Sequence, residues 1–138
     1  MSSTTRGTWV KNPPGTPWKA YHEEIGASCT GQTDTALFTL DISGCKAVSI
    51  LIDNIDAAQD LDYTIQYTLD KSDSTIWQEA FAADALGEGA QVALWLTEGT
   101  GVQAINTPYA PVLPAEAIKG LFSAESNTTD FSVWVVGI

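Results

Sequence analysis

The sequence has few positive charges and a single histidine. Six Lys and Arg residues stand against 17 Asp and Glu residues, which gives a formal net charge of -11. Nucleic-acid binding requires clustered cations that displace counterions, and the cations here are scattered singly. The same shortage of cations opposes attraction to an anionic membrane. We therefore expect neither a nucleic acid nor a membrane as a partner.

The sequence also lacks the residue sets that carry catalysis. His22 stands alone, so neither a zinc site rich in histidine nor a nucleophilic triad based on histidine can be completed. No G-x-S-x-G motif occurs, and Gly87–Gly89 and Gly99–Gly101 match no phosphate-binding loop, so these glycines are expected to mark turns. We expect no enzymatic activity and no cofactor, and we expect His22 to lie on the surface.

Cysteines and long apolar runs are scarce as well. Cys29 and Cys45 are the two thiols, and the absence of an apolar leader at the N-terminus favours reduced thiols at synthesis, although a bridge between them stays open. No run approaches the roughly 18 apolar residues that cross a bilayer. The sequence therefore predicts a protein that is made and left soluble and is not anchored in a membrane.

What the sequence does contain is a series of short runs in which apolar and polar residues alternate. Such runs predict half-buried strands, here Ala36–Ile42, Ala47–Asp53, Leu61–Leu69, Gln91–Thr97 and Phe131–Val136. Ile118–Ala124 predicts a further strand, and Trp18–Ile25 predicts an edge strand before a loop over Gly26–Thr35. We expect an all-β fold, an antiparallel β-sandwich of jelly-roll or immunoglobulin type, over residues 18–138.

Three connecting segments carry residues with a defined local preference. Asp41–Lys46 contains Ser-Gly and predicts a turn that joins adjacent strands. Leu69–Thr75 predicts a hairpin in which Asp and Ser side chains bond to the turn backbone. Glu79–Gly87 is rich in Ala and ends in Gly, so it predicts one helical turn.

Residues 1–17 form an N-terminal segment of different composition. Pro13, Pro14 and Pro17 oppose a regular helix and favour extended backbone. Extended chain of this length reaches about 55 Å, which is far enough to touch a neighbouring subunit. We predict an arm over residues 1–17, with a loose tail as the alternative. The expected interface residues are Trp9, Pro13 and Pro14 of the arm and Trp18 directly after it.

Two ligand hypotheses remain open at this stage. Asp53, Asp56, Asp60 and Asp62 offer oxygen ligands for Ca²⁺ between two predicted strands, but they lack the Gly and the final Glu of an EF-hand loop. A solvated acidic loop is the ordinary alternative.

Aromatic side chains could instead bind a sugar. Trp77, Trp95 and Trp134 fall in strand-like runs, which is more typical of core or inter-subunit packing. Tyr63, Tyr67 and Tyr109 could stack on a carbohydrate. The alternation of Tyr63 with Tyr67 on one strand face favours the core just as readily.

Three segments resemble small β-sandwich virion proteins of tailed bacteriophages. They are L-D-I-S-G-C-K-A-V-S-I, Y-T-I-Q-Y-T-L-D-K-S-D-S-T-I-W-Q and the C-terminal stretch from L-P-A-E-A-I-K-G to V-W-V-V-G. The resemblance spans residues 36–138. The chain departs from the commonest hairpin of that group at Ser72–Ile76, where Asp-Gly usually precedes the Trp, so the turn is expected to differ.

The resemblance implies a structural role on a virus particle. A decoration or cement protein that stabilises the head through symmetric inter-subunit contacts is the role it favours. The expected partners are the major capsid protein or other virion proteins, within a homo-oligomer for which a trimer is favoured. A tail or head-fibre component is the alternative, and a carbohydrate-binding module is a further one. The expected location is the virion, after synthesis in the host cytoplasm.

Overall fold

The computed structural model describes residues 4–5, 19–30, 35–73, 75–98, 112–125 and 128–138, and these residues form an all-β fold. No helix occurs among them, and therefore none that could cross a bilayer. The strands are β1 (Thr4–Thr5), β2 (Ala20–Thr30), β3 (Thr35–Asp41), β4 (Ala47–Asn54), β5 (Leu61–Thr68), β6 (Gln78–Leu86), β7 (Gln91–Glu98), β8 (Val112–Leu113), β9 (Ala117–Ala124) and β10 (Thr128–Gly137).

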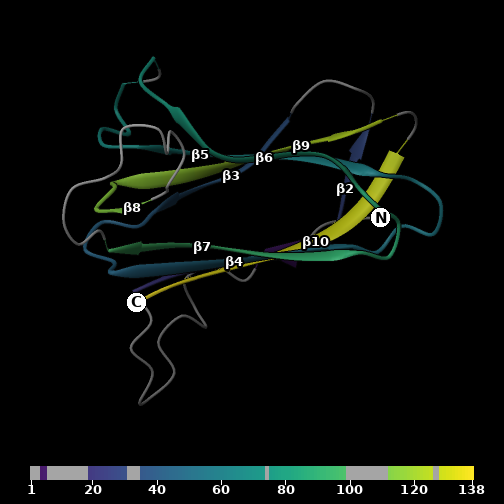
Figure 1. The fold of residues 1–138 in the computed structure, drawn as a ribbon, viewed down its shortest axis with the longest axis horizontal. Helices are drawn as coiled ribbons and strands as arrows, with labels where there is room; N and C mark the ends of the chain where they lie inside the picture. The colour runs from purple at the N-terminus through teal and green to yellow at the C-terminus, as the bar shows by residue number, and fades with distance from the viewer. Residues whose placement is uncertain (1–3, 6–18, 31–34, 74, 99–111, 126–127) are drawn as a thin grey trace.

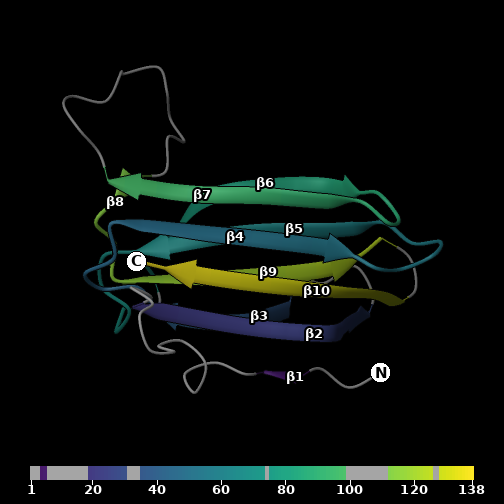
Figure 2. The same ribbon diagram turned by 90° about the horizontal axis from the view of Figure 1, so that it is seen from below.

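The strands form two sheets that lie face to face (Figure 1). One sheet has the order β1-β2-β10-β4-β7-β8 and the other has the order β3-β9-β5-β6. The pairings are antiparallel except for the short parallel pair of β7 with β8. Figure 2 shows β5 and β6 opposite β4 and β7, and β9 and β3 opposite β10 and β2. The predicted antiparallel sandwich is confirmed.

Alternation along the strands builds the core between the two sheets. On β10, Phe131, Val133 and Val135 are at most 1% exposed, because successive side chains of a strand point to opposite faces. The ring of Phe122 on β9 stacks on Phe131 with 4.5 Å between centroids. This contact joins the two sheets at the centre of the sandwich.

Asn54 closes one end of the sandwich through hydrogen bonds. Its side-chain amide donates to the carbonyl oxygens of Gln59 at 2.9 Å, Leu86 at 2.9 Å and Gly87 at 3.1 Å. Asn54 is fully buried at the end of β4, and Leu86 ends β6 in the other sheet. Because buried carbonyl groups need a partner, this single side chain ties the two sheets together.

The predicted helical turn over Glu79–Gly87 is wrong. This segment is strand β6, which pairs with β5 and places Phe81 opposite Ile65. Ala has a high helix propensity, but propensity is a weak preference that pairing with a buried neighbouring strand overrides. The strand ends at Ala85 and Leu86, where Ala85 has a φ of 64°.

Two further connections differ from expectation. Asp41–Lys46 does not join adjacent strands, because β3 pairs with β9 in one sheet and β4 pairs with β10 and β7 in the other. The predicted loop Gly26–Thr35 is also wrong at its start. There β2 continues to Thr30, which pairs with Thr128 at the beginning of β10.

The predicted hairpin over Leu69–Thr75 is confirmed as the connection between β5 and β6. The Asp70 carboxylate accepts a hydrogen bond from the backbone N–H of Ser72 at 3.0 Å, and the Asp73 carboxylate accepts one from Thr75 at 2.9 Å. The acidic side chains therefore hold the turn backbone as expected.

Candidate functional site

The outward-facing side of the six-stranded sheet is the candidate functional surface, and we call it the outer face. The strand register places its members side by side, with Trp134 between Glu23 and Leu51, and Ser49 between Val136 and Trp95. The outer face comprises Tyr21 and Glu23 on β2, Trp134 and Val136 on β10, Ser49 and Leu51 on β4, and Ala93 and Trp95 on β7. Each of the four strands thus contributes apolar or aromatic side chains to the outer face, with Glu23 and Ser49 as the polar members.

Two large apolar side chains of the outer face are open to solvent. Trp95 is 61% exposed and Leu51 is 37% exposed. Scattered exposed apolar residues are ordinary, whereas a contiguous apolar area marks an interaction site. Trp is also the residue type that most often supplies binding energy at protein interfaces. The outer face therefore has the composition of a contact surface.

Hydrogen bonds fix the aromatic side chains beside this area. Tyr21 donates from its hydroxyl to Oε2 of Glu23 at 2.9 Å, and Trp134 donates from Nε1 to Oε1 of the same carboxylate at 3.4 Å. Glu23 is only 5% exposed. A held aromatic ring loses little conformational entropy on binding, so this group is preorganised for contact.

The three tryptophans in the described part of the chain do not lie in the core. Trp95 and Trp134 are on the outer face, and Trp77 precedes β6, where the ammonium of Lys119 lies 4.2 Å from its ring centroid. Leu51 is the sequence signal for the outer face. In the alternation of β4, position 51 should be polar if its side of the strand faced only water, but it is a Leu.

The tyrosines do not form a common stacking platform on the described surface. Tyr63 is 6% exposed, and Tyr67 packs against the core. This confirms the alternative in which alternation turns both inward. Tyr109 lies outside the described residues.

The predicted arm is described at two residues. Thr4 and Thr5 form β1 and pair antiparallel with Ile25 and Glu24 of β2. The expected interface residues Trp9, Pro13, Pro14 and Trp18 lie outside the described residues, as does Gly99–Gly101. Their part in an interface stays a prediction.

His22 is mostly buried, so its expected surface position is wrong. It points between the sheets, with its side chain 12% exposed, its ring centroid 4.9 Å from that of Phe38 and Nε2 3.3 Å from Oε1 of Glu24. The register opposite Val135 gives the reason, because paired residues share a face and Val135 lies in the core. Burial lowers the pKa of His22, and the Glu24 carboxylate opposes that shift.

We expect His22 to make the fold less stable in mild acid. The unfolded chain takes up a proton on this residue near pH 6.5, whereas the folded chain does so only at lower pH. Its stabilising contribution is therefore complete above about pH 6.5 and is lost as the pH falls below that value. Between about pH 7.5 and about pH 5.5 the melting temperature should fall further for the wild type than for His22→Gln. An equal fall in both proteins would show that His22 does not titrate in this range.

The acidic side chains of the predicted calcium loop bind backbone groups. Asp56 accepts hydrogen bonds from the N–H groups of Ala58 and Gln59, both at 2.9 Å, and from that of Asp130 at 3.2 Å. These hydrogen bonds lower the pKa of Asp56. Asp62 accepts the N–H of Ala85 at 2.7 Å. Among the described residues, no three His, Cys, Asp or Glu side chains are grouped to hold a metal ion.

Both cysteines are buried thiols that form no disulfide. The Sγ of Cys29 donates to the carbonyl oxygen of Thr129 at 3.8 Å, and burial raises the pKa of Cys29 to about 11. Because the thiolate is the reactive form, this cysteine is chemically inert at neutral pH.

Comparison with known proteins gives structural neighbours only. No family model matches the sequence, and no curated protein matches it. Chains of infectious bursal disease virus are similar in fold. That of the Gt strain gives a TM-score of 0.41 at 14% identity over 91% of this chain and 36% of that chain. The chain of the Gx strain gives a TM-score of 0.43 at 15% identity, over 84% of this chain and 32% of that chain.

A third neighbour is a chain of T=1 particles derived from infectious bursal virus, with a TM-score of 0.42 and 13% identity over 83% of this chain and 29% of that chain. This protein thus spans about a third of the length of each of the three neighbours. At this degree of similarity the likeness carries no conclusion about function.

Proposed function

We propose that this protein is a non-enzymatic structural component of a virus particle, acting as a decoration or cement protein on the head. The observation that carries the proposal is the outer face, where Trp95 and Leu51 are exposed beside the fixed ring of Trp134. An apolar, preorganised surface on a small sandwich is suited to burial against another protein subunit. The major capsid protein is the proposed partner, and a trimer is the proposed form of the protein on the shell.

Such a protein stabilises a shell by mass action. It binds the assembled shell and not the dissociated subunits, so each bound copy favours the assembled state. The net charge of -11 supports this role, because mutual repulsion keeps free copies soluble until a complementary surface is present.

Electron microscopy of virus particles labelled with an antibody against this protein tests the proposal. Label distributed over the head is the expected result. Label on the tail alone would replace it with a role as a tail component. Label on no particle would reject a virion role and favour the carbohydrate-binding alternative.

Trp95→Ala is expected to reduce particle binding without affecting the fold. The side chain is 61% exposed, so the free energy of unfolding should change by no more than about 0.5 kcal/mol. If Trp95 is a central contact, the affinity for particles should fall at least about tenfold. Co-sedimentation with particles measures the affinity, and chemical denaturation measures the stability.

Leu69→Ala is the matched control for this experiment. Leu69 is 68% exposed and follows β5 in the other sheet, so its loss removes an exposed apolar side chain away from the outer face. Particle binding should stay unchanged in this variant. Equal binding by Trp95→Ala and the wild type would remove the outer face from the proposed interface.

A further inference from the structure

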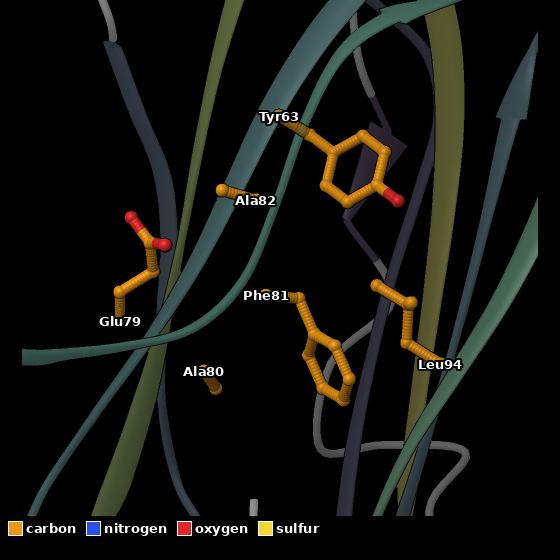
Figure 3. A pocket seen from close by; sticks show the side chains of 6 residues that line it. All are labelled: Tyr63, Glu79, Ala80, Phe81, Ala82 and Leu94. Carbon is orange, nitrogen blue, oxygen red and sulfur yellow. The ribbon is translucent and has the colours of Figure 1, made fainter. Parts of the chain in front are cut away.

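A pocket opens between the sheets on the side of the sandwich where β6 and β7 lie. It has a volume of about 390 Å³ and is lined by Tyr63, Glu79, Ala80, Phe81, Ala82 and Leu94. Figure 3 shows the rings of Tyr63 and Phe81 and the side chain of Leu94 around a common space, with the Glu79 carboxylate set apart from them. The walls are therefore aromatic and aliphatic, and one acid lies at the rim.

The strand register explains which side chains face this pocket. Phe81 points inward because it lies opposite the fully buried Ile65, and a register shift on β6 turns Glu79 outward. Leu94 on β7 points inward because it lies opposite the buried Ile50. The pocket and the outer face are thus on opposite sides of β7.

Small side chains on β6 leave the space unfilled. On the β9 side of the sandwich, the interior is filled by contacting aromatic rings, those of Phe38, Phe122 and Phe131. The residues on either side of the inward ring on β6 are Ala80 and Ala82. Ala80 is the extra residue of a bulge, because the register with β5 shifts around it. Protein interiors are close-packed, so a space of this size is suited to a ligand.

Tyr63 supplies a polar group to the walls of the pocket. It is 6% exposed, and within the described residues its hydroxyl makes no hydrogen bond. Figure 3 places this hydroxyl on the Leu94 side of the ring. Burial raises the pKa of Tyr63, so the hydroxyl keeps its proton at neutral pH and remains a donor. Because a buried donor without an acceptor costs free energy, a ligand with an acceptor oxygen gains a hydrogen bond here.

The charge and size of the pocket select an uncharged ring compound. No Lys, Arg or His occurs from residue 72 to residue 118, the stretch that contains β6 and β7, and Glu79 at the rim repels anions. A charged group of either sign would also lose hydration between apolar walls. A cavity of roughly 150 Å³ takes up benzene, so this larger pocket has room for one or two fused rings.

The position of the pocket at the side of the sandwich allows entry without separating the sheets. In the described part of the chain β6 pairs only with β5, so it ends its sheet. Phe81 and Leu94 are only partly buried, and Ala82 is exposed. A ligand can therefore reach the inward side chains from the β6 edge.

We propose that this pocket binds a small uncharged molecule of one or two fused rings, whose acceptor oxygen takes the hydrogen bond of the Tyr63 hydroxyl. The rings of the ligand lie between Phe81 and Leu94. This binding site goes beyond the proposed virion role and does not depend on it, because it uses none of the residues of the outer face.

Titration of the full-length protein with indanone tests the site. Indanone is a bicyclic ketone, and indane is the same ring system without the acceptor oxygen. The methyl NMR signals of Ala80, Ala82 and Leu94 should shift and saturate with a Kd of about a millimolar or tighter. Tyr63→Phe keeps the ring and should weaken indanone binding about fivefold, while the affinity for indane stays within about twofold.

Tyr67→Phe is the matched control, because it removes the same hydroxyl group from the same strand. Tyr67 packs against the core and is not one of the residues that line the pocket. This variant should bind indanone like the wild type. Thermal unfolding of both variants verifies that the fold is retained.

The absence of a saturable shift of the three methyl signals up to the solubility of indanone would overturn the inference. So would equal affinities of Tyr63→Phe and the wild type for indanone, or equal weakening by Tyr63→Phe and Tyr67→Phe. Equal weakening of indane and indanone by Tyr63→Phe would also overturn it, because the lost hydroxyl would then not be a hydrogen-bond donor to the ligand. These outcomes are separate from the location of the protein on particles.

Discussion

Phe131→Ala is expected to lower the free energy of unfolding by about 3–5 kcal/mol, which is the usual cost of removing a fully buried aromatic ring. Phe131 is 1% exposed and stacks on Phe122 from the opposite sheet. Its loss leaves a cavity at the centre of the sandwich that the paired β10 backbone is not free to close. Denaturant unfolding followed by circular dichroism measures the change.

Trp134→Ala on the same strand is the comparison for this variant. Trp134 faces outward and donates to Glu23, so its loss should cost about 1–2 kcal/mol, within the range of ordinary single substitutions. A larger loss for Trp134→Ala than for Phe131→Ala would mean that the two faces of β10 are assigned the wrong way round.

Gly120→Ala is expected to destabilise the protein by about 1–3 kcal/mol through overpacking. A methyl group at Gly120 would lie 2.7 Å from Cζ of Phe38 and 3.0 Å from Cε2 of Phe122. The Phe38 ring therefore has to shift within packed surroundings, because it is 5% exposed and its centroid lies 4.9 Å from that of the His22 ring. Thermal and denaturant unfolding both report the loss.

Gly87→Ala is the matched control for overpacking. An added methyl group at Gly87 meets no atom within 4 Å, so the change in stability should stay within about 0.5 kcal/mol. Equal losses at the two positions would indicate a general cost of replacing glycine and would contradict the tight fit of Phe38 against β9.

The strands were the most predictable part of the fold. Alternation placed Ala47–Asp53 within β4, Gln91–Thr97 within β7 and Phe131–Val136 within β10, each within a few residues of its observed bounds. The hairpin over Leu69–Thr75 was also predictable, because Asp side chains act on backbone groups only two residues away. These features depend on neighbours along the chain.

The errors arose where distant partners decide the structure. Glu79–Gly87 is a strand because β5 pairs with it, and β2 extends to Thr30 because the start of β10 lies alongside. On β2, the even-numbered residues before Gly26 point toward the other sheet. His22 is one of them, and it is buried beside Phe38. At Gly26, with a φ of 69°, a bulge opposite Ser132 interrupts the register.

The candidate surface was only half predictable. The sequence indicates that Trp95 and Trp134 lie in strands and suit core or inter-subunit packing, but alternation cannot say which face of a strand meets solvent. The register shows that both lie on the outer face with Leu51. The pocket lined by Phe81 and Leu94 was not predictable, because its walls come from different sheets.

The sequence by itself determined the acidic character, the β class and most strand positions, since charge is additive and a strand needs only a local period of two. The tertiary structure decided which sheet each strand joins, which face is buried and where the open edge lies. Those properties depend on pairings between residues as distant as Thr30 and Thr128, and only the packing of the whole chain selects among such pairings.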